Sequence, residues 1–166
     1  MKAILERCSI RSYTKEKIEK EDIKKILRAG MSAPSACNRQ PWEFIVVEDK
    51  EKLKEMSTLT PYAGMLKGAA MGMVVAVNTK NHLNIEYDLQ DCAAATENML
   101  VEANHLNIGS CWLGGYPNED RIESIRNYFS LPDYIMPLWM ISFGYHNEDK
   151  KIKNKWNEDK IHWEKY

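Results

Sequence analysis

The alternation of apolar and polar positions predicts both strands and helices in this chain. Four apolar runs, bounded by polar or turn-forming residues, predict buried strands: 43–47, 71–77, 111–113 and 138–145. Five segments are predicted to be helices, either because their apolar residues recur at helical spacing or because they are polar stretches between chain breaks. They are 18–30, 49–58, 62–70, 89–106 and 119–129. The order of these elements is not a clean βαβ series, so the predicted fold class is α+β.

Two of the predicted helices have recognisable ends. Gly30 fits a C-terminal stop for the first helix, and Asp88 fits the N-cap of the longest one. Apolar and small residues wrap most of the way round this longest helix, 89–106. A helix without a wide polar face is buried, either in the centre of a subunit or between two subunits.

Length and composition narrow the class of protein. The 166 residues predict a single domain, 1–166, and the hydrophobic content of 44% is that of an ordinary globular chain. A net charge of -1 argues against a nucleic-acid or anionic-membrane partner. No apolar run approaches the ~20 residues of a membrane span, so we expect a cytoplasmic protein. The four cysteines are scattered, and we expect no metal site.

The first candidate for chemistry is the segment that contains Arg7, Ser9 and Arg11. In an extended segment these alternating side chains share one face. Two guanidinium groups and a hydroxyl on one face suit a phosphate group. The alternative is that both arginines are simply solvated.

Two further segments are candidates for binding. The stretch 33–42 holds small and amide side chains between Pro34 and Pro41, which predicts a shaped loop before a buried strand. It is either a binding loop or a surface connection. The highly charged tail, 147–166, carries Trp156, Trp163 and Tyr166, too many aromatic groups for a disordered segment. We expect this C-terminal arm to pack on a partner subunit.

Several short motifs, in this order, closely resemble the nitroreductase family of FMN-dependent oxidoreductases. They are Arg7-x-Ser9-x-Arg11, Pro34-Ser35-x-x-Asn38-x-Gln40-Pro41-Trp42, Trp112-Leu113-Gly114-Gly115 and Lys153-x-Lys155. The resemblance covers nearly the whole chain. It implies a nitroreductase-like fold with a small, mostly antiparallel sheet, and a homodimer with two FMN molecules at its interface.

The resemblance also implies a role for each motif. The FMN phosphate and the pyrimidine end of the flavin ring would be held by Arg7, the backbone at Cys8, Ser9 and Arg11, with Lys153 and Lys155 completing the phosphate site. The loop that covers the flavin from the other subunit would contain Pro34, Ser35 and Ala36, tied by Asn38 and Gln40. The backbone N–H groups of Gly114 and Gly115 would meet flavin N5 and O4. The open face of the flavin would be lined by Tyr62, Met65 and Tyr116.

The two glycines also admit a simpler interpretation. Gly114 and Gly115 could serve only a turn before Pro117, with positive φ angles that a side chain would strain. Under the flavin-contact interpretation, by contrast, the missing side chains permit a close approach of the backbone to the ring.

The activity that the resemblance implies is carried by the cofactor. NAD(P)H would pass hydride through flavin N5 to an electron-poor acceptor, such as a nitroaromatic or a quinone, in a ping-pong reaction. The sequence offers no side-chain triad or carboxylate pair for catalysis, and its four histidines are unclustered. Two alternatives stay open: a flavin-binding redox sensor or reservoir without turnover, and a relative that dehalogenates its substrate or degrades flavin.

Overall fold

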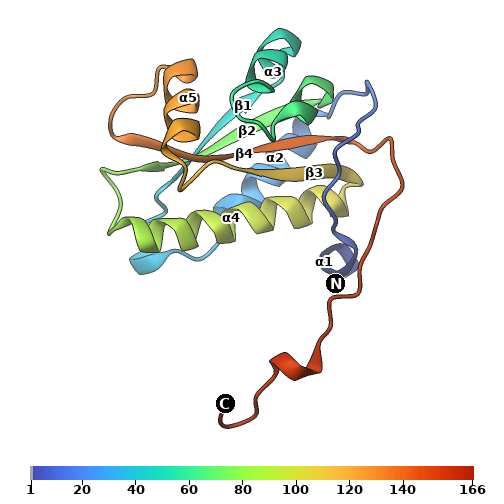
Figure 1. The fold of residues 1–166 in the computed structure, drawn as a ribbon, viewed down its shortest axis with the longest axis vertical. Coiled ribbons are helices and arrows are strands. Elements are labelled where there is room, and N and C mark those ends of the chain that lie inside the picture. The colour runs from blue at the N-terminus through green and yellow to red at the C-terminus, as the bar shows by residue number, and fades with distance from the viewer. Residues whose placement is uncertain (1) are drawn as a thin grey trace.

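The computed structural model describes residues 2–166, and a four-stranded antiparallel sheet lies at its centre (Figure 1). The strands are β1 (Trp42–Val47), β2 (Met71–Asn78), β3 (Ile108–Gly114) and β4 (Ile135–Tyr145). Their order in the sheet is β1-β2-β4-β3, and all three pairings are antiparallel. The predicted α+β class and antiparallel sheet are therefore confirmed.

Helices cover both faces of the sheet (Figure 1). On one face lie α2 (Lys20–Met31) and α4 (Ile85–His105); on the other lie α3 (Lys50–Met56), the 3-10 helix η2 (Gly64–Gly68) and α5 (Glu119–Phe129). The period-two alternation of β2 produces this layering, because successive side chains of a strand point to opposite faces. Met73 and Val75 join the core beneath α2 and α4, whereas Val74 joins the one beneath α3 and α5.

The two ends of the chain lie close together before the tail leaves the globular part. Helix α1 (Lys2–Glu6) packs near the C-terminal end of α4. Beyond β4 the tail runs past α1 and extends away from the sheet, with only the 3-10 helix η3 (Glu158–Lys160) in it (Figure 1). Among residues 2–166, no helix combines the length and the apolarity that crossing a membrane requires.

A bulge in β4 shapes one end of β3. Val75 pairs with Trp139 while Ala76 pairs with Pro137, so Leu138 is the extra residue. The carbonyl oxygen of Leu138 instead accepts a hydrogen bond of 2.6 Å from the backbone N–H of Tyr116. The bulge therefore draws the segment after β3 against the edge of β4.

Two predicted helix ends are wrong. Asn84, not Asp88, caps α4, since its side chain accepts a hydrogen bond from the backbone N–H of Tyr87. Asp88 lies one turn further on, buried, with its carboxylate 2.8 Å from Nδ1 of His82. The predicted start at residue 89 is too late because the helix begins directly after its N-cap, Asn84.

Gly30 does not end its helix either. Helix α2 continues to Met31, and a Cβ on Gly30 would lie 2.7 Å from Cγ of Met99 on α4. The residue is therefore glycine because α2 and α4 approach closely there. A sequence pattern cannot separate this role from that of a C-terminal stop.

Candidate functional site

The segment after α1 is held in an extended form against the sheet, beside β3. The backbone N–H of Ile10 donates to the carbonyl oxygen of Ser110 at 2.9 Å, and a Cβ on Gly109 would lie 2.8 Å from the Ile10 side chain. The Tyr13 hydroxyl lies 2.7 Å from Ser142 Oγ. Within this segment the side chain of Ile10 is buried, whereas Ser9 and Arg11 on either side of it are exposed.

Burial also acts on the Tyr13 hydroxyl. It raises the pKa of this group well above its ordinary value, although the hydrogen bond to Ser142 acts in the opposite direction. Tyr13 is therefore a neutral anchor for the segment and not an acid or base.

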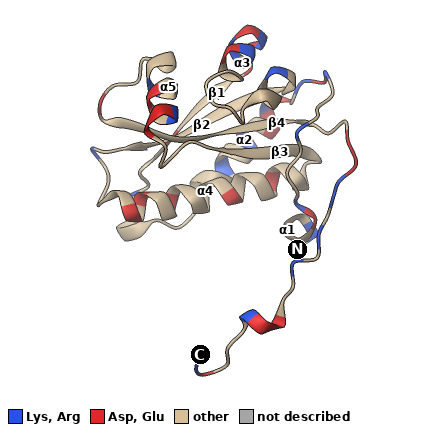
Figure 2. Cartoon of the chain, viewed as in Figure 1, with Lys and Arg blue, Asp and Glu red and all other residues tan. Residues whose placement is uncertain are grey.

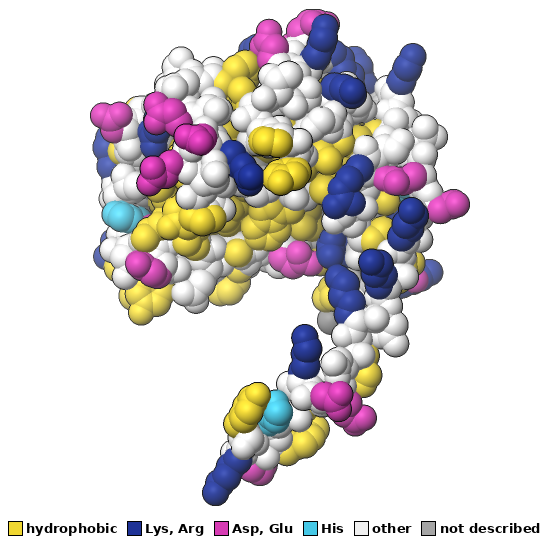
Figure 3. Space-filling view, in the orientation of Figure 1, with side chains coloured by type: hydrophobic (Ala, Val, Ile, Leu, Met, Phe, Trp, Pro, Cys, Tyr) yellow, Lys and Arg dark blue, Asp and Glu magenta, His cyan; other side chains and the backbone are white. Residues whose placement is uncertain are grey.

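A cavity of about 990 Å³ opens between this segment and the tail, and we call it the basic cavity. Its lining includes the five predicted phosphate-binding side chains: Arg7, Ser9, Arg11, Lys153 and Lys155. Figure 3 shows lysine and arginine side chains gathered around the beginning of the tail, and Figure 2 marks basic residues along the ribbon of the tail there. Residues almost 150 positions apart in the sequence thus meet at one site.

Three acidic residues also line the basic cavity: Glu97, Glu148 and Asp149. Glu97 lies 3.1 Å from Nε of Arg7, so one arginine is partly neutralised. Within residues 2–166, Arg11, Lys153 and Lys155 lie in no ion pair. Lys151 also lines the basic cavity and lies in no ion pair of the described residues, so four cations are available to an anionic ligand.

Glu148 joins the tail to the segment after α1. Its carboxylate accepts hydrogen bonds from the backbone N–H groups of Arg11, at 2.6 Å, and Ser12, at 2.9 Å. These two bonds lower the pKa of the Glu148 carboxyl below its ordinary value. Nearby, the Asn104 side chain donates to the carbonyl oxygen of Ala3 and accepts from Nζ of Lys150, so α4 fixes both segments.

A second cavity, of about 630 Å³, lies at the end of β3, and we call it the strand-end cavity. Its lining includes Arg11, Tyr62, Met65 and Gly114. Arg11 lines both cavities, so they adjoin. A Cβ on Gly114 would meet nothing within 4 Å, which means that the backbone there faces open space.

Gly115 has a different environment. A Cβ there would lie 2.5 Å from the carbonyl oxygen of Leu138, the bulged residue of β4. Among residues 2–166, no glycine has a positive φ angle, so the simpler interpretation of both glycines as positive-φ turn residues is wrong. The glycine at 114 leaves the cavity open, and the one at 115 permits close backbone packing.

Tyr116 is not part of the strand-end cavity. It is half-buried and packs against the main core, while its backbone N–H is held by Leu138. Tyr62 and Met65 line the cavity, so the structure brings together two of the three residues predicted for the substrate face.

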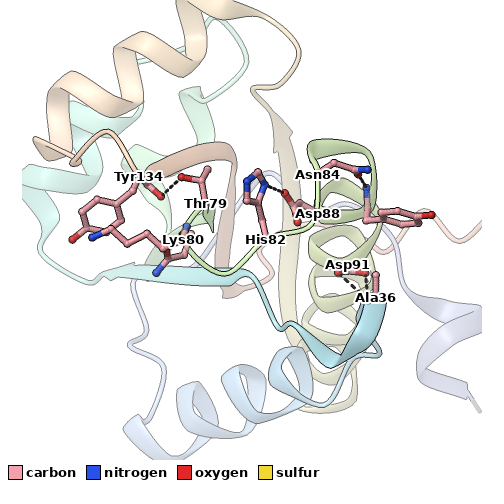
Figure 4. A network of polar contacts seen from close by, with 10 residues as sticks. Ala36, Thr79, Lys80, His82, Asn84, Asp88, Asp91 and Tyr134 are labelled. Atoms are coloured by element: carbon pink, nitrogen blue, oxygen red, sulfur yellow. Dashed lines mark hydrogen bonds and ion pairs between the residues drawn. The ribbon is translucent and has the colours of Figure 1, made fainter.

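The loop predicted to cover the flavin lies against the N-terminal part of α4 (Figure 4). The backbone N–H of Ala36 donates to both carboxylate oxygens of Asp91, at 3.1 Å each. Burial raises the pKa of Asp91, and the hydrogen bond from Ala36 opposes this shift. Two hydrogen bonds from Gln40 hold the loop together. Its side-chain Nε2 donates to Oδ1 of Asn38, and the backbone N–H of Gln40 donates to Oγ of Ser35.

The residues of this loop do not line either cavity of the described subunit: Pro34, Ser35, Ala36, Asn38 and Gln40. The loop contacts α4 at Asp91, whereas the basic cavity reaches α4 at Glu97. Within one subunit, the structure therefore brings together the basic side chains and Gly114 but not the covering loop.

Sequence reasoning gave no site role to six residues that line the strand-end cavity: Pro61, Gly64, Cys111, Trp112, Leu113 and Arg121. Burial raises the pKa of the Cys111 thiol, which disfavours a nucleophilic thiolate. Trp112 packs on Trp139, with ring centroids 4.7 Å apart. The only available signal for Arg121 was its place on the helix that follows the two glycines.

A cationic cavity that adjoins an open strand end, on an antiparallel sheet covered by helices, suits a cofactor with a phosphate at one end and a flat group at the other. The comparison with known proteins identifies the family. The profile of the nitroreductase family matches residues 4–61 and 58–145, and the chain belongs to this family.

Individual relatives agree over nearly the full length. A protein of Archaeoglobus fulgidus, provisionally named NADH dehydrogenase/NAD(P)H nitroreductase, is 44% identical and covers 100% of this chain and 98% of its own. A crystal structure from Clostridium acetobutylicum, provisionally named NADH oxidase, has a TM-score of 0.95 at 44% identity, with 99% of each chain covered.

A third relative was solved with a cofactor. A provisionally named nitroreductase from Desulfovibrio desulfuricans, in complex with FMN, has a TM-score of 0.86 at 28% identity, covering 99% of this chain and 96% of that one.

Proposed function

We propose that this protein is an NAD(P)H-dependent oxidoreductase with FMN as its cofactor, and that it reduces electron-poor acceptors such as nitroaromatics or quinones. The observation that carries this proposal is the pair of adjoining cavities, one cationic and one open at Gly114, that share Arg11. Family membership supports the same activity.

The donor set of the basic cavity fits the FMN phosphate. Arg7 and Arg11 provide planar forks of N–H donors, Ser9 provides a hydroxyl, and the two lysines provide further charge. Arg11, Lys153 and Lys155 are free of ion pairs in the described part of the chain, so phosphate binding would break no ion pair of these three residues.

The strand-end cavity fits the flat ring of the flavin. We assign the backbone N–H of Gly114 to the N5 and O4 edge, because the absence of a side chain leaves room there. A fixed N–H donor stabilises negative charge that develops on reduction. Tyr62 and Met65 then remain for the face on which substrates bind.

The active unit is a homodimer with two FMN sites at its interface. The covering loop lies outside both cavities of its own subunit, so a partner would have to supply it. Figure 3 shows hydrophobic side chains gathered along the open side of α4. Trp156 and Trp163 of the tail are 71% and 82% exposed, and a partner surface would bury them.

FMN bound in this site would supply the hydride chemistry between NAD(P)H and the acceptor, which we propose to be of the ping-pong type. The side chains of this protein bind and orient: Arg11 connects the two cavities, Gly114 holds the reactive edge, and the partner's loop excludes water. The lining of the strand-end cavity contains no aspartate, glutamate, histidine or lysine, and its one thiol, Cys111, is buried.

The test is an absorption spectrum of the purified protein, followed by stopped-flow mixing with NADH or NADPH. We expect an FMN spectrum that bleaches on reduction and returns on addition of a nitroaromatic or a quinone. Bleaching without turnover would favour a redox sensor or reservoir, and consumption of the flavin itself would favour a flavin-degrading relative. A colourless protein that does not take up FMN would contradict the proposal.

A further inference from the structure

We propose that Arg121 selects substrates that carry an anionic oxygen group, a carboxylate or a phosphate, beside a flat ring. This inference rests on the proposed function, since it names the class of substrate that the strand-end cavity accepts. It assigns to α5 a role in specificity that the motifs of the sequence did not indicate.

The position of Arg121 places its charge at the rim of the cavity. Arg121 lies in the first turn of α5, lines the strand-end cavity, and is half-buried. Its guanidinium carbon lies 5.0 Å from the centre of the Tyr62 ring, and Nη1 lies 3.4 Å from the carbonyl oxygen of Gly114. The side chain is therefore oriented by an aromatic face and by the residue that we assign to the flavin edge.

The charges around the cavity favour an anion. Its lining contains two cations, Arg11 and Arg121, and no aspartate or glutamate. Within residues 2–166, Arg121 lies in no ion pair, although Glu119 and Asp120 precede it in the helix. If Arg11 is engaged by the cofactor, Arg121 is the cation that remains for the substrate.

The hydrogen bonding of Arg121 leaves donors free. A guanidinium group has five N–H donors, and the hydrogen bond that Arg121 donates to the Gly114 carbonyl oxygen is long. The remaining fork matches the two oxygens of a carboxylate or a phosphate. Tyr62 and Trp112 provide aromatic surface beside it, so the cavity combines a wall for a flat ring with an anchor for an anion.

Two substrates of the proposed reaction could supply this anion. One is the acceptor, through a carboxylate on its ring. The other is the nicotinamide dinucleotide, through its phosphates. The chemistry is the same in both cases, and the two half-reactions distinguish them because each is measured separately.

The experiment compares 4-nitrobenzoate with 4-nitrobenzamide, which differ in the charge of one substituent. Binding of each to the purified protein is measured by calorimetry, and kcat/KM of each is measured at saturating NADH. Stopped flow gives the dissociation constant of NADH and of NADPH for the reductive half-reaction. These quantities are compared between the wild type, Arg121→Gln, Arg121→Lys and Arg28→Gln. Arg28 is an exposed arginine on α2, outside both cavities, and is the matched control for a lost charge.

We expect Arg121→Gln to lower the preference for the anionic ligand about tenfold, as the loss of one charge-assisted contact implies. Arg121→Lys should keep part of the preference, and Arg28→Gln should keep all of it. The preference of the wild type should also fall as salt rises. If only the affinity for nitrobenzoate falls, the anion that Arg121 binds belongs to the acceptor. If only the affinities for NADH and NADPH fall, Arg121 binds the phosphates of the dinucleotide.

Equal preferences in the wild type and in Arg121→Gln, for both the acceptor pair and the dinucleotides, would overturn the inference. This outcome is separable from failure of the proposed function. In the first case the flavin spectrum and its bleaching are normal and only the selectivity is insensitive to Arg121. In the second case the protein lacks FMN or is not reduced, and the calorimetric comparison still decides whether Arg121 binds the anion.

Discussion

Arg11 is the residue that connects the two cavities of the site. Its side chain lines both cavities, and its backbone N–H is bonded to Glu148. The side chain lies in no ion pair within the part of the chain that the structure describes, so its removal should break no internal ion pair.

Arg11→Ala should therefore weaken FMN binding about ten- to a hundredfold, the value of one charge-assisted hydrogen bond. Flavin-fluorescence titration measures this affinity, and the melting temperature without FMN should change little. Arg28→Ala is the control for the loss of an exposed arginine. An unchanged affinity in Arg11→Ala would remove this residue from the phosphate site.

Gly114 and Gly115 should respond differently to the same substitution. Gly114→Val places a side chain in open space, so we expect a slower reduction of bound flavin with nearly unchanged stability. Gly115→Val places it against the Leu138 carbonyl, so we expect a loss of about 1–3 kcal/mol in the free energy of unfolding. Chemical denaturation and the flavin-normalised reduction rate, measured for both variants, distinguish the two effects. If the two variants changed the reduction rate equally and the free energy of unfolding equally, our assignment would be contradicted.

At the scale of elements, the site depends on how the tail is joined to the segment after α1. Glu148 bonds the backbone amides of Arg11 and Ser12, and these bonds lower its pKa. A carboxyl group with a lowered pKa in the folded state stabilises that state above its unfolded pKa, and this stabilisation is lost as the pH falls through the folded value.

We therefore expect the wild type to lose part of its attachment between tail and segment in the acid range, below the ordinary glutamate pKa of about 4.3. Glu148→Gln should lack this acid-dependent step and should show weaker FMN binding at neutral pH. Limited proteolysis of the tail as a function of pH measures the attachment, and Asp149→Gln is the neighbouring control. The same acid profile in Glu148→Gln as in the wild type would refute the role of Glu148.

At the scale of the whole molecule, the tail connects two parts of our proposal. Residues 153 and 155 line the basic cavity, and the aromatic residues beyond them are exposed in the described subunit. Two truncations separate these roles. Truncation after Lys155 keeps both cavity lysines and removes the aromatic residues, whereas truncation after Asn147 also removes Glu148 and the lysines.

We expect truncation after Lys155 to give monomers or aggregates that still bind free phosphate weakly, and truncation after Asn147 to lose FMN as well. Size-exclusion chromatography with light scattering gives the oligomeric state, and the flavin absorbance gives the occupancy. A soluble yellow monomer from either truncation would contradict a dimer that depends on the tail.

Much of the fold could be predicted from the sequence because it depends on local pattern. The apolar run 71–77 corresponds to β2, and the helix predicted at 119–129 has the observed bounds of α5. The motifs also sufficed to identify the nitroreductase family, since the spacing of Arg7, Ser9 and Arg11 and the glycine pair are properties of the chain itself.

The tertiary structure alone decided the roles that depend on distant partners. Gly30 has no room for a side chain because Met99 lies against it, and Gly115 has none because of the bulged Leu138. Asp88 is held by its contact with His82. None of these pairs forms a recognisable local pattern. Arg121 became a candidate only when α5 placed it beside Tyr62 and Gly114. Periodicity is a property of neighbouring residues, whereas a site is made by side chains that folding brings together from separate elements. The sequence therefore determined the elements and the family, and the packing of those elements determined which residues share a cavity.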